Sequence, residues 1–200
     1  MSAERFLGAD LALARLIAAH GPCALRRRRV ADPFAALTRS IVAQRISSKA
    51  AKTVYARLEQ ALGGPPTPAL VLQRRATTLR AAGLPQAKVD ALRELARRVR
   101  DEELPLARMG RWSDARVEAA LSEIKGVGRW TAQIFCIFHL ARPDVFPDGD
   151  LGVLEGLRRL DGLAARPRPA QARARAEAWA PYRSTAAWYL WRSLDGPAQV

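Results

Sequence analysis

Apolar residues recur at helical spacing along nearly the whole 200-residue chain, and no stretch alternates polar and apolar residues as a half-buried strand would. Gly and Pro residues interrupt this spacing where helices are expected to end. The pattern therefore predicts an all-α protein built from short helices. We expect them at about 4–19, 68–74, 75–82, 85–101, 114–124, 129–141, 170–178 and 181–194, with two more flanking a break near 44–47 and another from about residue 150.

Two glycines lie one residue apart between two helical patterns, in the stretch "EIKGVGRWTA". Gly126 and Gly128 would each cost about 1 kcal/mol inside a helix, so a tight turn between two helices is the better interpretation. Amides at the start of the second helix, flanked by Lys125 and Arg129, would form an anion site suited to a DNA phosphate. An ordinary helical hairpin with glycine caps explains the same residues equally well.

The chain is strongly basic, with 33 Lys and Arg against 19 Asp and Glu and a formal net charge of +14. This excess favours a polyanionic partner such as nucleic acid. Four of the basic residues are lysine, which leaves 29 arginines, and alanine is abundant. An arginine-rich proteome would produce the same bias, so charge alone leaves both explanations open.

Several classes of protein are excluded by what the sequence lacks. Two cysteines, Cys23 and Cys136, are too few for a disulfide framework, a four-cysteine zinc site or a four-cysteine iron–sulfur cluster. His20 and His139 form no metal-ligand pattern. The N-terminus carries acidic residues and no basic leader, and no apolar run reaches membrane-spanning length. We expect a soluble intracellular protein in a reducing compartment, the cytoplasm or nucleoid, with no contact with membranes.

Four blocks of sequence together resemble the helix-hairpin-helix DNA glycosylase superfamily, in its 3-methyladenine DNA glycosylase II (alkylated-base) branch. They are "PFAALTRSIVAQRISSKAA", "LRAAGLPQAKVDALRELA", "LSEIKGVGRWTAQIF" with the downstream "DVFPDGDLGVLEGL", and "PYRSTAAWYLWRSL". The likeness covers most of residues 32–194. It implies one glycosylase domain over residues 1–200 with two helical lobes and the active-site cleft between them. The expected lobes are 32–112 plus the hairpin 113–141, and 1–31 with 142–200.

The resemblance gives the hairpin and the break at 44–47 specific roles on DNA. Backbone amides near Gly126 and Gly128, with Lys125, Arg129 and Thr131, would hold phosphates, and the family allows a monovalent cation there. The gap left by a flipped base would be filled from the break, where the matching residues are Gln44, Arg45 and Ile46. Arg45 aligns with the wedge, although the family usually has Gln or an apolar residue there. A surface arginine at a helix break is the alternative.

Aromatic side chains match the family's base pocket. A cationic N-alkylated purine gains about 0.5–2 kcal/mol over an aromatic ring. Trp130 and Trp191 match the pocket tryptophans, and Trp188 and Tyr189 are their neighbours. Ile134 replaces a tyrosine found in some relatives, which implies an altered substrate range. Tryptophans at helical spacing are otherwise ordinary core residues.

Asp150 lies 22 residues after Gly128 and matches the catalytic aspartate of the family. A carboxylate near the anomeric carbon would stabilise the sugar cation as the glycosidic bond breaks. Asp150 also stands where the N-cap of the next helix is expected, and the two roles are compatible. Asp148 is the nearest competitor. Arg183 and Ser184 match a pair expected to support the aspartate or the backbone.

Trp130 occupies the position where the glycosylase/lyases of the superfamily carry a Schiff-base lysine. We therefore expect a monofunctional enzyme that removes N-methylated purines from double-stranded DNA in base excision repair. We expect a monomer that needs no cofactor and has no iron–sulfur cluster. The alternatives are a glycosylase for other damaged or mismatched bases, and a non-catalytic DNA-binding protein. The basic run 26–29 is explained by a solvated loop or helix edge, and a phosphate contact there is the alternative.

Overall fold

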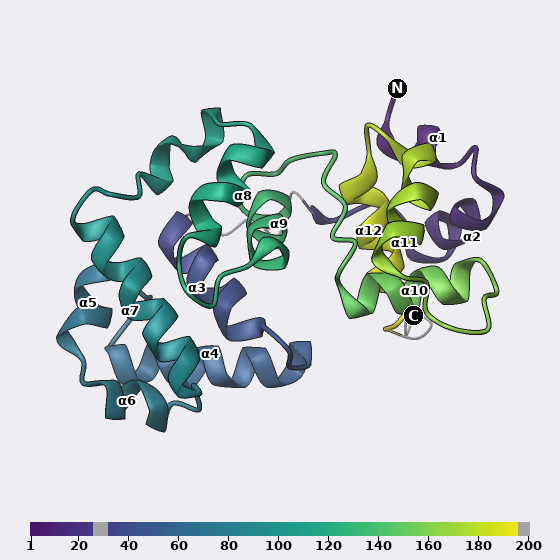
Figure 1. The fold of residues 1–200 in the computed structure, drawn as a ribbon. Coiled ribbons are helices and arrows are strands. Elements are labelled where there is room, and N and C mark those ends of the chain that lie inside the picture. Colours follow the sequence, from purple (N-terminus) through teal and green to yellow (C-terminus); the bar gives the residue numbers. More distant parts are fainter. Residues whose placement is uncertain (26–31, 196–200) are drawn as a thin grey trace. The chain divides into compact units, whose positions relative to one another are not determined.

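We analysed a computed structural model of the chain, which describes residues 1–25 and 32–195. These residues fold into helices joined by turns, without a β-strand among them, so the predicted all-α class is confirmed (Figure 1). The chain divides into two compact units, Met1–Arg29 with Ala141–Val200, and Val30–Leu140. The basic run 26–29 lies outside the described residues. Within the described part of the chain, no helix is long and apolar enough to span a membrane.

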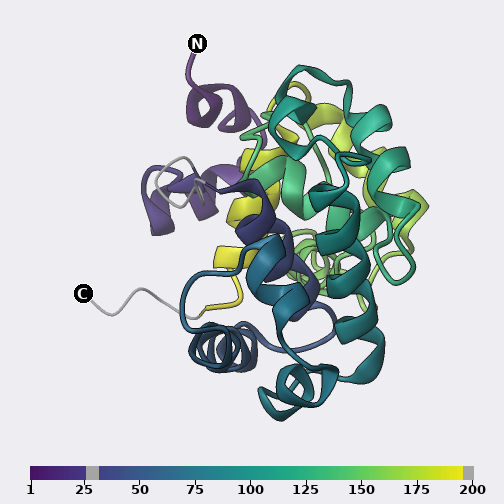
Figure 2. The ribbon, with the colours of Figure 1, turned by 90° about the vertical axis from the view of Figure 1, so that its left-hand side faces the viewer.

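The unit Val30–Leu140 is organised around the buried helix α3, which packs against α4, α7 and α9. Helix α4 runs across this unit in Figure 1 and is seen nearly end-on in Figure 2. Helix α5 lies along α7, and α8 pairs with α9. The bounds are α3 (Pro33–Ala43), α4 (Ser48–Leu62), α5 (Pro68–Gln73), α6 (Ala76–Ala81), α7 (Gln86–Arg100), the 3-10 helix η2 (Leu106–Arg111), α8 (Asp114–Ser122) and α9 (Arg129–Phe138).

The other unit joins the N-terminal helices to the C-terminal ones. Helix α12 packs against α10 and α2. The hydrophobic core of this unit includes the fully buried rings of Trp179 and Tyr189. The bounds are α1 (Ala3–Leu7), α2 (Leu11–His20), α10 (Leu151–Leu160), α11 (Pro169–Ala176), the 3-10 helix η3 (Glu177–Trp179) and α12 (Arg183–Arg192).

One predicted helix is wrong, because the pattern over residues 4–19 forms two helices. Gly8 caps the end of α1, and Asp10 caps the start of α2 by accepting hydrogen bonds from the amides of Ala12 and Leu13. An aspartate bonded to amides ahead of it starts a new helix at that point. The break at 44–47 is confirmed, since α3 ends at Ala43 and α4 begins at Ser48.

Candidate functional site

The hairpin loop between α8 and α9 (residues 123–128) turns at Gly126, whose φ of +89° favours glycine. A Cβ on Gly126 would lie 3.5 Å from the Cβ of Ala91, so this turn sits directly on α7. Val127 is only 3% exposed. Ile124 in the same loop is fully buried, so the loop is anchored by two buried side chains and by a close glycine contact.

Gly128 serves the hairpin differently from Gly126. Its backbone is extended (φ −106°), it caps the start of α9, and that helix start has no side-chain cap hydrogen bond. No heavy atom would lie within 4 Å of a Cβ at Gly128. This arrangement leaves the backbone open to approach by a phosphate at the positive end of a helix.

The predicted phosphate contacts around the glycines have different surroundings. Lys125 is exposed, and Arg129 forms an ion pair with Glu118 at 3.4 Å. Thr131 is buried, and its Oγ1 accepts a hydrogen bond from the Gln44 side chain. The Thr131 hydroxyl is therefore already engaged inside the protein.

The α3–α4 loop (Gln44–Ser47) contains the predicted wedge residues and is tied to the hairpin. Gln44 Nε2 donates to the Gly126 carbonyl at 2.9 Å and to Thr131 Oγ1 at 2.8 Å. Arg45 is exposed and has a left-handed backbone (φ +58°), which is uncommon for a residue with a side chain. Ile46 is 40% exposed. The structure thus directs Gln44 inward at the hairpin and leaves Arg45 and Ile46 at the surface.

Lys88 on α7 was not identified from the sequence. Its Nζ donates to the carbonyls of Val42 and Gln44, at 2.8 Å each. Burial lowers the pKa of this ammonium group. The available signal was its rarity, because a lysine stands out among 29 arginines.

Asp150 is the N-cap of α10, as its position in the sequence predicts. Its Oδ1 accepts hydrogen bonds from the Val153 amide and from the indole Nε1 of Trp191, both at 2.8 Å. The first bond fixes the side chain on its own helix, and the second joins it to α12. The carboxylate is therefore held from two directions.

Two glycines on α10, both missed by the sequence analysis, bring α12 close to Asp150. A Cβ on Gly152 would lie 3.0 Å from Asp150 Oδ1 and 3.0 Å from Trp191 Cδ1. A Cβ on Gly156 would lie 2.5 Å from the backbone oxygen of Leu190. Glycines four residues apart in an amphipathic helix were the available signal, because they mark one face where another backbone can approach.

Arg183 and Ser184, predicted to support the site, hold the chain that leads to Asp150. Arg183 Nε and Nη2 donate to the two carboxylate oxygens of Asp144, each at 2.8 Å. Ser184 Oγ donates to the Arg142 carbonyl at 2.7 Å and accepts from the Val145 amide at 3.0 Å. These contacts fix residues 142–145 against the start of α12.

Asp148, the competitor of Asp150, has a different environment. It is 4% exposed, and its Oδ2 accepts a hydrogen bond from Arg173 Nε at 2.8 Å. This arginine engages the Asp148 carboxylate inside the protein. Asp150 is the more exposed of the two.

The two predicted pocket tryptophans belong to different units. Trp130 and Ile134 lie on α9 and are partly buried, whereas Trp191 lies on α12 with Asp150 nearby. Trp188 and Tyr189 are buried in the core of the unit that contains Trp191 and Asp150. Over residues 1–25 and 32–195, no three His, Cys, Asp or Glu side chains gather where they could hold a metal ion.

Comparison with known proteins connects these features to DNA repair. The model of the HhH-GPD superfamily of base excision DNA repair proteins matches residues 38–181, a range that contains the α3–α4 loop, the hairpin and Asp150. DNA-3-methyladenine glycosylase 1 of Schizosaccharomyces pombe is 33% identical over 165 residues, covering 81% of this chain and 72% of the relative.

Solved structures extend the likeness to nearly the whole chain. The S. pombe 3-methyladenine DNA glycosylase in complex with abasic DNA matches with a TM-score of 0.91 at 32% identity, covering 98% of this chain and 97% of that one. A DNA-3-methyladenine glycosidase from Bacillus halodurans matches with a TM-score of 0.78 at 31% identity, covering 98% and 90%.

Proposed function

Because this chain belongs to the HhH-GPD superfamily of base excision DNA repair proteins, we propose that it is a 3-methyladenine DNA glycosylase that excises N-methylated purines from duplex DNA. The observation that carries the proposal is the Asp150 carboxylate, held at the start of α10 by the Val153 amide and the Trp191 indole. The hairpin, whose Gly128 backbone is open to a phosphate, supports the proposal independently.

The reaction is hydrolysis of the N-glycosidic bond. The bond between C1′ and the alkylated base breaks, its electrons neutralise the positive charge on the base, and the sugar becomes an oxocarbenium ion. Asp150 stabilises that cation, water adds to C1′, and the proton of this water passes to solvent. Because an alkylated base is already cationic, its departure needs little acid catalysis, and one carboxylate suffices.

Base flipping prepares the substrate, because a stacked base is out of reach. The hairpin amides with Lys125 and Arg129 hold the backbone phosphates, and Arg45 enters the gap that the base leaves. The exposed, left-handed position of Arg45 supports this role. Trp130, Trp191 and Ile134 match the base-pocket positions of the family, and aromatic rings at such positions attract a cationic purine.

Trp130 also determines the product. A lyase needs an amine to form a Schiff base with the sugar, and this position of α9 carries an indole. The enzyme is therefore monofunctional, and it leaves an abasic site with an intact strand. We also propose that it works as a monomer in the cytoplasm or nucleoid.

Hydrolysis by this route requires no cofactor and no iron–sulfur cluster. A monovalent cation between the hairpin and a phosphate would find backbone carbonyls in the loop 123–128, which is the ligand class such ions prefer. The Gly126 carbonyl in this loop already accepts a hydrogen bond from Gln44.

Release of free bases from methylated DNA tests the proposal. Wild-type protein should free 3-methyladenine, detected by chromatography, and should not nick the strand without alkali. Asp150→Asn keeps an N-cap oxygen but should slow release by roughly a hundredfold or more. Asp90→Asn changes the charge equally at an exposed position bonded only locally to Gln86, and should match wild type.

Two outcomes would contradict parts of this proposal. Wild-type protein that binds DNA but frees no base would be a non-catalytic binding protein. Release by Asp150→Asn at the wild-type rate would remove the catalytic role from this carboxylate.

A further inference from the structure

A lysine of α7, Lys88, supports the α3–α4 loop. Lys88 Nζ donates to the carbonyls of Val42 and Gln44, in the last turn and at the C-cap of α3. Carbonyls at a helix C-terminus lack intrahelical partners, and a cation there also complements the helix dipole. Lys88 therefore completes the end of α3 at the point where the chain turns into the loop.

Arg45 depends on this support because its backbone conformation is unfavourable. A left-handed conformation is strained for a residue with a side chain, and it persists only where its surroundings enforce it. Gln44 is fixed through its side chain by the hairpin and through its carbonyl by Lys88. Ser47 caps α4 through the Ala50 amide. The loop is thus held at both ends, with Arg45 and Ile46 exposed between them.

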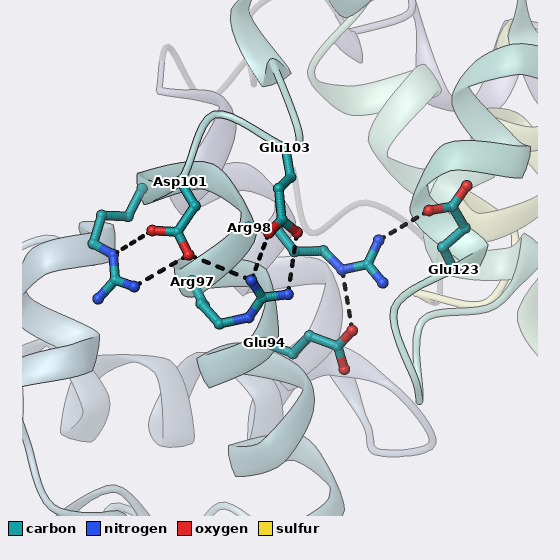
Figure 3. A network of polar contacts seen from close by, with 7 residues as sticks. Glu94, Arg97, Arg98, Asp101, Glu103 and Glu123 are labelled. Atoms are coloured by element: carbon teal, nitrogen blue, oxygen red, sulfur yellow. Dashed lines mark hydrogen bonds and ion pairs between the residues drawn. The ribbon is translucent and has the colours of Figure 1, made fainter.

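The same helix supports the phosphate-binding hairpin. Gly126 packs on Ala87 and Ala91 of α7. Further along α7, Arg98 bonds to Glu94 and to Glu123 at the start of the hairpin loop (Figure 3). Glu123 is 67% exposed, so this ion pair contributes little. Lys88, with two bonds to backbone carbonyls, is the stronger link.

We infer that Lys88 is a positioning residue for base flipping, which holds the α3–α4 loop so that Arg45 stands at a fixed distance from the phosphate-binding hairpin. The inference rests on the proposed glycosylase function. Lys88 donates to the Gln44 carbonyl, and the Gln44 side chain donates to the hairpin carbonyl of Gly126. These hydrogen bonds connect the proposed phosphate site with the loop that carries Arg45. A displacement of about 1 Å in such a positioned group can cost up to a hundredfold in rate.

A double-mutant cycle tests this role. Single-turnover excision is measured on a duplex with one 7-methylguanine for wild type, Lys88→Met, Arg45→Ala and the double variant. Lys88→Met should slow excision roughly tenfold, whereas in the Arg45→Ala background it should change the rate by less than about twofold, because the wedge is already gone. Lys88→Arg keeps a cationic donor and should recover most of the rate. Arg97→Met, on the exposed ion pairs of the same helix, should match wild type (Figure 3).

A second substrate separates positioning from general stability. With the same lesion in an unpaired bulge, less unstacking is needed, and the loss caused by Lys88→Met should shrink. Urea unfolding is followed for each variant, and Lys88→Gln replaces Lys88→Met in the cycle if that protein unfolds. The inference would be overturned if Lys88→Met lowered the excision rate equally with and without Arg45, or equally on both substrates. The wild-type enzyme would remain active in that case. Wild-type protein that releases no base from either DNA would instead refute the proposed function.

Discussion

At the residue scale, the Asp150 carboxylate has donors on two helices, the Val153 amide of α10 and the Trp191 indole of α12. The cap bond follows from local sequence, whereas the indole bond requires two helices at close approach. Gly152 permits that approach, because any Cβ there would touch both Asp150 and Trp191. A residue without a side chain thus governs the surroundings of the proposed catalytic group.

Gly152→Ala should lower the excision rate about tenfold or more, because the methyl group would displace the carboxylate or the indole by several tenths of an ångström. Stability should change little, since the helix propensity of alanine offsets part of the steric strain. Single-turnover excision and urea unfolding measure the two effects. Gly149→Ala, where a Cβ would meet no atom within 4 Å, is the matched control. Wild-type activity in Gly152→Ala would show that this close contact is not needed.

At the scale of the element, the two glycines of the α8–α9 hairpin allow folding and the proposed DNA binding to be tested separately. Gly126 has a positive φ and packs on α7, whereas Gly128 is extended and open. Only the first glycine is required by the turn itself. The second leaves room for a ligand.

Gly126→Ala should therefore destabilise the protein by about 1 kcal/mol or more, measured by urea unfolding. Gly128→Ala should leave the free energy of unfolding nearly unchanged but weaken binding to duplex DNA, measured by fluorescence anisotropy, because its methyl group would stand where the phosphate approaches. The two variants serve as controls for each other. Unchanged DNA affinity in Gly128→Ala would argue for an ordinary hairpin without a phosphate.

At the scale of the whole molecule, the net charge of +14 gives duplex DNA a long-range attraction. DNA affinity should fall steeply with salt, with a logarithmic slope of about −0.9 for each phosphate neutralised. Lys125→Ala should reduce this slope by about one. Arg97→Ala, whose guanidinium is paired with Asp101 and Glu103, should not change it. An unchanged slope in Lys125→Ala would remove this lysine from the phosphate contacts.

The sequence predicted the helical class, the hairpin and the N-cap position of Asp150 because each depends on residues within a few positions of one another. The same reasoning was wrong at Gly8–Asp10, where helical periodicity continues but a local side-chain cap starts a new helix. The roles of Trp130, Arg45 and the other site residues came from the resemblance and stay predictions.

The contacts that only the tertiary structure decided join residues far apart in the chain. Lys88 reaches Val42 over 46 residues, Gln44 reaches Thr131 over 87, and Trp191 reaches Asp150 over 41. No local pattern encodes such pairs, because a donor in a helix is equally compatible with solvent until packing presents an acceptor. The sequence by itself thus determined which groups are available. They are the basic charge, the open backbone of Gly128 and the carboxylate of Asp150 that caps α10. Packing of α7 and α12 decided which side chains hold them in place.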